Sequence, residues 1–328
     1  MIDPANTTTT SLLPAAVASA APPAASPVPL DFSATCEFIV ALVARGGPTP
    51  REFPVLDALM RRLPDLSAAQ LERLREAFGV ALTEADTMQG HAWLKPHGYA
   101  GDFEIIDRLY RERITADEKH AAWDRYFHAQ PASRAVRNRK RYFHSVLDRF
   151  AARHEPVRVL NLASGPGRCM AEWLAANPHA PVSFDCVELD ANAIEHAREL
   201  TRPFAGRVAF QRQNVLRFTP PLAYDLIWAA GICDYFTAPI FARMLRRLLP
   251  ALAPGGELIA GNFSDANPTR SYMEILGDWR LHHRSAEELR QIAISAGVLA
   301  EDIRVGAEPE GINLFLHIAA RPGAVAAA

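Results

Sequence analysis

Residues 157–168 read Val-Arg-Val-Leu-Asn-Leu-Ala-Ser-Gly-Pro-Gly-Arg, and the other predicted elements are placed relative to them. The apolar first half predicts a buried strand that ends at a turn of small residues. After the turn, apolar residues from Cys169 to Leu174 recur at helical spacing. This order of strand, tight turn and helix leaves the free N–H groups of the helix start above the strand end. We therefore expect a ligand with nucleotide-like parts at the carboxyl edge of a parallel sheet.

From residue 157 onward, strand-like runs alternate with helical patterns, which is typical of a doubly wound α/β fold. The expected fold class is α/β, with a mostly parallel, seven-stranded Rossmann-like sheet and an N-terminal α-helical cap. The expected strands are 157–162, 182–188, 207–212, 224–229, 256–261, 301–306 and 312–319. The expected helices between them are 167–177, 191–201, 238–250 and 285–296.

The residues before the sheet predict helices. Residues 31–94 repeat apolar side chains at helical spacing, and a long helix is expected at about 132–152. Ser67 with Gln70 has the spacing of a capping box, as do Thr115 and Glu118. The apolar faces of these helices either pack a cap or line an apolar substrate tunnel, and the pattern leaves both open.

These patterns predict four parts of the chain. Residues 1–30 are rich in Ala and Pro and are expected to form a disordered tail. Residues 31–150 are expected to form the cap and the substrate-binding region, and residues 151–320 the cofactor-binding domain. Residues 321–328 read as a second tail.

Composition excludes several classes of partner. The net charge of −2 argues against a general nucleic-acid binder. No apolar run is long enough for stable membrane insertion. The four cysteines lack CxxC spacing, and the first residues lack the basic start of a signal peptide, so we expect a cytoplasmic protein. His91 and His97 have no further ligands at metal-binding spacing, so no metal is expected. A homodimer stays open.

Three cofactors fit a turn of this kind: ATP, NAD and S-adenosylmethionine. The ATP P-loop requires Gly-Lys-Ser/Thr, whereas Gly167 is followed by Arg168 and Cys169. The dinucleotide fingerprint requires glycine where Met170 stands, which also opposes an NAD-dependent oxidoreductase. S-adenosyl-L-methionine is therefore the expected cofactor.

Polar residues after the next two strands supply the remaining contacts. Glu188 ends the second strand about 20 residues after the turn, where a carboxylate can accept hydrogen bonds from ribose hydroxyls. Asn214 and Val215 follow the third strand, and the pair suits an adenine, one residue reading its amino group and the other packing on its face.

The order of these motifs resembles the class I S-adenosylmethionine-dependent methyltransferases, over about residues 157–320. The resemblance implies that the latter part of the chain is an S-adenosylmethionine-binding methyltransferase domain. Two positions depart from the family pattern: Asn161 replaces a frequent aspartate, and Ala163 replaces the usual first glycine. The implied cofactor contacts are Ala163, Ser164, Gly165, Pro166, Gly167, Glu188, Leu189, Asn214, Val215, Ala230 and Gly231.

A narrower resemblance involves residues outside those motifs. The segments are His97 to Glu104, Ala230-Gly231 with Asp234-Tyr235, Gly261 to Phe263, Asp278-Trp279 and Gly311 to Leu316. They are similar to a bacterial subgroup that makes 3-hydroxy fatty acid methyl esters, the quorum-sensing signals of some plant-pathogenic bacteria. The resemblance implies methylation of the carboxylate of a 3-hydroxy fatty acid or a similar small acid. It leaves the chain length and the stereochemistry open.

A carboxylate acceptor sets simple demands on the site. It is already a nucleophile at pH 7, so it requires positioning donors and a dry channel rather than a general base. Tyr99 and Asn262 are the expected catalytic donors, one in the cap loop and one after the fifth strand. The other expected contacts to the small-molecule or acyl substrate are His97, Asp102, Arg139, Asp234, Tyr235, Arg270, Tyr272, Trp279 and Arg284.

Two alternatives remain. An alcohol, phenol or amine acceptor on a natural-product intermediate would benefit from a base, for which Asp102, Asp234 and His97 are the candidates. A non-catalytic sensor of S-adenosylmethionine would have the same sheet but would not need an acceptor pocket.

Overall fold

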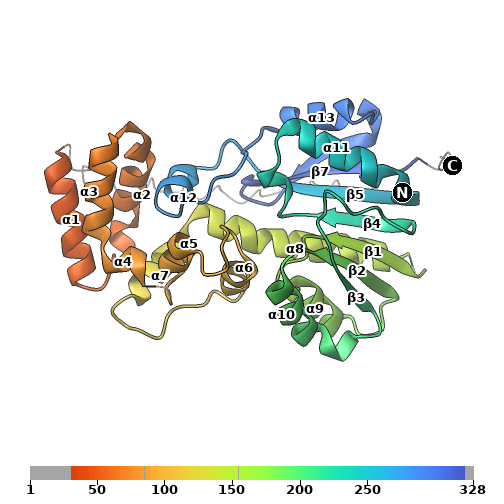
Figure 1. Cartoon of the computed structure of the whole chain (residues 1–328), viewed down its shortest axis with the longest axis horizontal. Coiled ribbons are helices and arrows are strands. Elements are labelled where there is room, and N and C mark those ends of the chain that lie inside the picture. Colours follow the sequence, from red (N-terminus) through yellow and green to blue (C-terminus); the bar gives the residue numbers. More distant parts are fainter. Residues whose placement is uncertain (1–30, 85, 154, 322–328) are drawn as a thin grey trace, which may run out of the picture.

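The computed structural model describes residues 31–84, 86–153 and 155–321 (Figure 1). The predicted tail at 1–30 lies outside the described residues, and so do residues 322–328 of the second tail. Figure 1 shows a sheet flanked by helices at one end of the chain's long axis and a group of helices at the other. The long helix α8 (Pro131–Ala151) runs between the two parts.

The sheet has seven strands in the order β3-β2-β1-β4-β5-β7-β6, which confirms the predicted fold class. Strand β7 runs antiparallel to both β5 and β6, and the other pairs are parallel. The strands are β1 (Val157–Leu162), β2 (Val182–Glu188), β3 (Val208–Arg212), β4 (Tyr224–Ala229), β5 (Leu252–Phe263), β6 (Ile303–Ala307) and β7 (Asn313–Ala319).

Helices cover both faces of the sheet. Because side chains alternate along a strand, Val159 and Trp228 pack on one face and Leu160 and Ile227 on the other. The first face is covered by the second half of α8 together with α9 (Arg168–Ala176), and α10 (Ala191–Thr201) packs beside α9. The second face is covered by α11 (Ala238–Leu248) and α13 (Ala286–Ser295).

The N-terminal region is helical, as predicted. Its helices are α1 (Phe32–Ala44), α2 (Phe53–Arg62), α3 (Ala68–Phe78), α4 (Val80–Thr83), α5 (Met88–Leu94), α6 (Phe103–Tyr110) and α7 (Ala121–Ala129), followed by α8. The capping box of Ser67 and Gln70 is confirmed at the start of α3. The helix start predicted from Thr115 is wrong, because the Thr115 hydroxyl donates to Asp86 at 2.8 Å and α7 begins only at Ala121.

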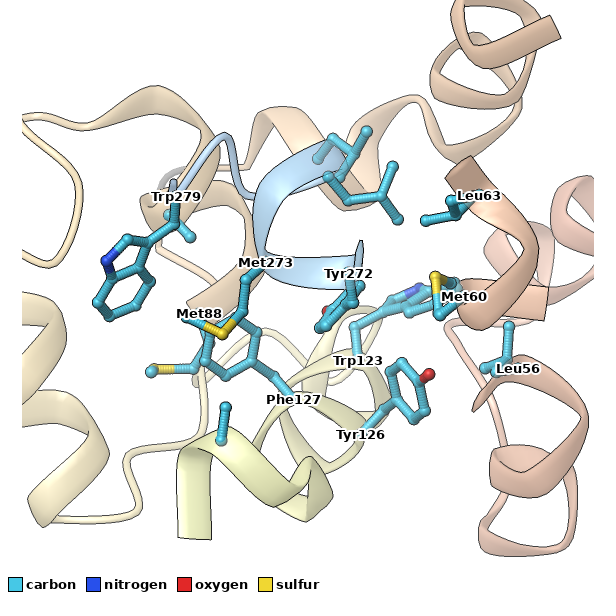
Figure 2. Packing of buried hydrophobic residues seen from close by; sticks show 14 of the residues in the cluster. Leu56, Met60, Leu63, Met88, Trp123, Tyr126, Phe127, Tyr272, Met273 and Trp279 are labelled. Atoms are coloured by element: carbon cyan, nitrogen blue, oxygen red, sulfur yellow. The ribbon is translucent and has the colours of Figure 1, made fainter. Parts of the chain in front are cut away.

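The core of the cap also recruits a segment from beyond the fifth strand. Helix α12 (Arg270–Ile275) lies among the cap helices in Figure 1, and no helix was predicted there. Figure 2 shows Tyr272 and Met273 of α12 beside Phe127 of α7. The Tyr272 and Phe127 ring centroids are 6.1 Å apart. The predicted division at residue 150 stays a proposal. The first half of α8 and helix α12 pack in the cap core, whereas the second half of α8 packs on the sheet.

A largely buried ion pair joins the cap to the sheet domain. Asp107 of α6, whose side chain is 6% exposed, accepts from the Arg168 guanidinium at the start of α9, with Nη2 at 3.1 Å from Oδ2. Arg111 lies farther away, with Nη1 at 3.7 Å from Oδ2 of Asp107. A charge this buried is costly to leave without its partner.

We therefore expect Asp107→Asn to lower the free energy of unfolding by about 2 kcal/mol, because the partly buried Arg168 guanidinium loses its nearer carboxylate and keeps only Glu172, whose Oε1 lies 3.8 Å from Nη1. Urea denaturation measures the loss. The matched control is Glu274→Gln, which removes the exposed pair of Arg270 and Glu274 and should cost less than about 0.5 kcal/mol. Equal losses for the two variants would contradict this role of Asp107.

Candidate functional site

A cavity of about 730 Å³ lies where the cap meets the carboxyl ends of β1, β2 and β4. Its volume falls within the range of small-molecule sites, and its position at the strand ends is that of the ligand crevice in open α/β sheets. Residues from the cap, from the sheet and from the segment after α12 all line it. The predicted residues on its wall are His97, Tyr99, Arg139, Ala163, Ser164, Gly165, Pro166, Glu188, Leu189, Ala230, Gly231, Asp234, Tyr235 and Trp279.

The turn after β1 has a left-handed backbone at three positions. Ala163 has φ +49°, Gly165 φ +57° and Gly167 φ +70°. Gly167 is off the cavity wall, and a Cβ there would lie 2.7 Å from the Cβ of Ala197. This glycine therefore permits the close packing of α9 on α10, whereas Gly165 is on the cavity itself.

Glu188 is fixed at the end of β2 by three backbone N–H groups. Its Oε2 accepts from Gly165 at 2.9 Å, and its Oε1 accepts from Leu189 at 2.7 Å and Asp190 at 3.1 Å. The carboxylate thus faces the cavity in a set orientation and retains acceptor capacity for ribose hydroxyls.

One further group on the wall, the Ser164 hydroxyl, also fits S-adenosylmethionine. The Ser164 hydroxyl is buried and has no hydrogen-bond partner among the described residues, so it can serve a ligand. Asn161 donates from Nδ2 to the Met170 sulfur at 3.2 Å. The predicted adenine contacts, Asn214 and Val215, do not line this cavity: Asn214 accepts from Leu216 N–H at 2.8 Å, and Val215 is buried in the core.

The cap closes the cavity with the loop between α5 and α6, residues 95–102. The Tyr99 hydroxyl donates to Asp190 Oδ2 at 2.8 Å. The Tyr235 hydroxyl donates to the carbonyl oxygen of Ala100 at 2.9 Å and accepts from Trp279 Nε1 at 2.9 Å. The hydroxyl proton of Tyr99, predicted to be a catalytic donor, is therefore engaged with the strand end in this conformation.

Two charged side chains share the cavity wall near the end of β4. Arg139 of α8 is only 7% exposed, and its Nη1 donates to the carbonyl oxygen of Ala230 at 2.9 Å. Asp234 accepts the Phe263 N–H at Oδ1, at 2.6 Å. Burial raises the pKa of Asp234 to about 6, although the Phe263 hydrogen bond and the positive charges of Arg139 and Arg284 oppose the rise.

Five residues that were predicted to contact the methyl acceptor do not lie on this wall, and each has another partner in the protein. They are Asp102, Asn262, Arg270, Tyr272 and Arg284. Asp102 caps α6 and pairs with the buried His91, with its Oδ2 at 2.9 Å from Nε2. Asn262 Oδ1 accepts from Arg284 Nη1 at 2.6 Å, which occupies both side chains. Arg270 pairs with Glu274, and Tyr272 packs in the cap core.

Several wall residues were not predicted. They are Ala100, Gly101, Phe103, Ile106, Tyr110, Val136, Asn161, Cys169, Asp190, Trp228, Ile232, Phe263 and Leu281. Val136 precedes Arg139 by three positions and shares its helix face, so helical spacing from Arg139 was the available signal. Most of the others are apolar, and an apolar residue looks the same in a core and on a pocket wall.

Among residues 31–84, 86–153 and 155–321, no group of three His, Cys, Asp or Glu side chains could hold a metal ion. Within the same ranges, no helix is both long enough and apolar enough to cross a membrane.

Comparisons with known proteins match parts of the chain. The family model described as "Methyltransferase domain" matches residues 159–256. Nicotianamine synthase 9 of Hordeum vulgare is 32% identical over 120 residues, which cover 35% of this chain and 35% of that protein. The chemotaxis protein methyltransferase of Klebsiella aerogenes is 43% identical over 65 residues, 18% of this chain and 22% of that one. The chain therefore spans about a third or less of the length of these curated relatives.

A solved structure of a possible exported protein from Bordetella parapertussis has the same fold over most of the chain. Its TM-score is 0.60 at 20% sequence identity, and the match covers 89% of this chain and 97% of that one. The match therefore extends beyond the sheet domain into the cap.

The closing loop offers a matched pair of glycines for a test. Gly98 and Gly101 both have positive φ, but a Cβ at Gly98 would meet nothing within 4 Å, whereas at Gly101 it would lie 2.5 Å from the Trp279 ring and the Tyr235 hydroxyl. Both alanine variants incur the strain of a left-handed backbone, about 1 kcal/mol. We expect Gly101→Ala also to displace the loop and to weaken S-adenosylhomocysteine binding about tenfold or more, with Gly98→Ala within about threefold of the wild type. Calorimetry measures both affinities, and equal weakening would contradict the closing role of this loop.

Proposed function

We propose that the chain, whose residues 159–256 match the methyltransferase domain model, is a class I S-adenosylmethionine-dependent methyltransferase, and that it methylates the carboxylate of a small apolar acid. A 3-hydroxy fatty acid is the acceptor that the sequence resemblance favours. The product is then a methyl ester, and the role in quorum sensing implied by the resemblance is part of the same proposal.

The buried guanidinium of Arg139 is the observation that carries this proposal. It lies on the wall of the cavity beside the strand ends, where the cofactor is expected, with the carbonyl oxygen of Ala230 and the Tyr110 side chain as its neighbours. An arginine in a site shielded from water binds a carboxylate more strongly than a neutral hydroxyl, and it repels an ammonium group. It can therefore hold an acid for in-line attack on the methyl group.

The rest of the wall suits the apolar part of such an acid. Phe103 and Ile106 of α6, Val136 of α8, and Trp279 with Leu281 contribute apolar surface. Exclusion of water favours the reaction of a carboxylate with a sulfonium, because two opposite charges disappear in the transfer.

Asp234 favours a second candidate, an alcohol, phenol or amine acceptor. Its pKa of about 6 leaves it mostly ionised at pH 7, and it lies on the cavity wall, so it can accept a proton from an acceptor that must lose one. Of the three predicted bases, His97 is paired with Glu104 at 2.9 Å and Asp102 lies off the cavity wall.

The proposal is tested by incubating the protein with methyl-labelled S-adenosylmethionine and a panel of 3-hydroxy acids, phenols and amines. We expect labelled methyl esters from the acids. Label found only in phenols or amines would overturn the carboxylate assignment. Binding of S-adenosylhomocysteine without transfer to any member of a broad panel would favour the sensor instead.

The pH dependence separates the two acceptor classes by its sign. As the pH falls from 8 through about 6, Asp234 gains a proton and a negative charge near Arg139 disappears. For a carboxylate acceptor, kcat/KM should therefore rise or stay level over this range, because repulsion of the anionic substrate falls. For an acceptor that needs Asp234 as a base, kcat/KM should fall about tenfold per pH unit below the pKa.

Asp234→Asn completes this test, because the amide oxygen can still accept the Phe263 N–H. With a carboxylate acceptor, we expect the variant to retain activity within about threefold and to lose the pH dependence near 6. A loss of about 100-fold or more, measured at pH 7.5, would instead assign Asp234 as the general base.

A further inference from the structure

A second, much smaller cavity of about 20 Å³ lies in the cap and shares three wall residues with the large cavity. The shared residues are Val136, Phe263 and Trp279. These side chains therefore form the partition between the space at the strand ends and the interior of the cap. Figure 2 shows the Trp279 side chain set apart from the main group of cap residues, on the side of Met273 and Met88.

The small cavity is suited to an apolar group. Ala92, Leu109, Phe127 and Met273 contribute to its wall. Four of its polar wall residues already have partners: Gln89 donates to the carbonyl oxygen of Leu276 at 2.9 Å, Ser133 donates to that of Phe127 at 2.7 Å, Gln130 donates to Asp57 at 3.1 Å, and Thr269 accepts from Ala132 N–H at 3.3 Å. A cavity with a mostly apolar wall, whose polar groups largely bond within the protein, does not hold water well and accepts hydrocarbon.

Helix α8 connects the charged end of the large cavity to this apolar space. Arg139 lines the large cavity, Val136 lines both, and Ser133 and Ala132 line the small one. These positions recur at spacings of three and four along one helix face. The seven helical steps from Arg139 to Ala132 span about 10 Å at 1.5 Å per residue. The apolar tail of an acid whose carboxylate binds Arg139 would therefore extend along α8 toward the cap.

Trp279 is the largest side chain in the partition, and hydrogen bonds fix its position. Its Nε1 donates to the Tyr235 hydroxyl at 2.9 Å, and that hydroxyl donates to the carbonyl oxygen of Ala100 in the closing loop at 2.9 Å. Its backbone N–H donates to the carbonyl oxygen of Met273 at 2.9 Å. The indole thus stands between the two cavities in one orientation, supported from both sides.

We propose that Trp279 determines specificity for the length of the acceptor's apolar tail, by limiting how far the tail passes along α8 into the small cavity. This inference rests on the proposed function in one respect, namely that the acceptor is an acid with an apolar tail. In a smaller partition the two spaces merge and a longer tail fits, and each added methylene that is buried favours the longer acid.

The test compares Trp279→Phe with the wild type on saturated, unbranched 3-hydroxy acids of increasing length. We expect the ratio of kcat/KM for the longest acid to that for the shortest to rise about tenfold or more in the variant. The reciprocal variant Val136→Phe enlarges the partition and should lower the same ratio. The control is Trp123→Phe, a second buried indole in the cap that lines neither cavity, and it should leave the ratio within about twofold.

Failure of this inference is distinguishable from failure of the proposed function. If the wild type esterifies the acids and Trp279→Phe changes kcat/KM for all lengths by one factor, Trp279 does not set the length. If the wild type esterifies none of them, the proposed function fails, and calorimetry with the same acids and S-adenosylhomocysteine tests the inference directly. A length preference in binding that shifts in Trp279→Phe supports it, and binding that is absent or independent of length overturns it.

Discussion

Three backbone N–H groups converge on the Glu188 carboxylate, and the rest of the site depends on this arrangement. The bond from Gly165 holds the turn after β1 against the end of β2, so that both strand ends form one wall. Asp190, two residues after Glu188, accepts a hydrogen bond from the Tyr99 hydroxyl. This bond attaches the closing loop to the same wall. Through Ala100 and Tyr235 the loop in turn supports Trp279. The two ends of the cavity are thus linked by one series of hydrogen bonds.

The charges in the cavity follow from burial. Arg139 and Asp234 lie where water is scarce, so each affects the other more strongly than it would on the surface. Burial raises the pKa of Asp234 into the range just below neutrality, while the positive charges of Arg139 and Arg284 limit the rise. A site of this kind can change its net charge within the physiological range, and the charge of the acceptor decides whether that change helps or hinders the reaction.

The sheet could be predicted from the sequence because its strands are apolar, short and separated by clear turns. Strand β5 was predicted to begin at 256 but begins at Leu252, since Pro254 and Gly255 read as a turn although they lie within a strand whose register shifts opposite Tyr224 and Leu226. The wall of the cavity was predictable at the turn after β1, in the loop between α5 and α6, and at several positions that follow a strand. Such a position does not reveal its partner: Asn262 follows the pattern of a ligand contact, yet its oxygen accepts from Arg284, which lies 22 positions away.

The cap was harder to predict, because its core is assembled from segments distant in sequence. Helix α12 packs between helices that precede it by more than 100 residues, and no local pattern indicates this. Thr115 shows the opposite case, in which a correct local spacing is overridden by hydrogen bonds to Asp86 and Asp124. Tertiary partners of a capping side chain can thus override the local pattern of a helix start.

A crystal structure of the protein with S-adenosylhomocysteine and a 3-hydroxy fatty acid tests the central claim most directly. We expect the carboxylate to lie within hydrogen-bonding distance of the Arg139 guanidinium and the tail to point along α8 toward Trp279. An acid bound with its carboxylate away from Arg139, or with its hydroxyl beside Asp234 and facing the cofactor sulfur, would contradict it.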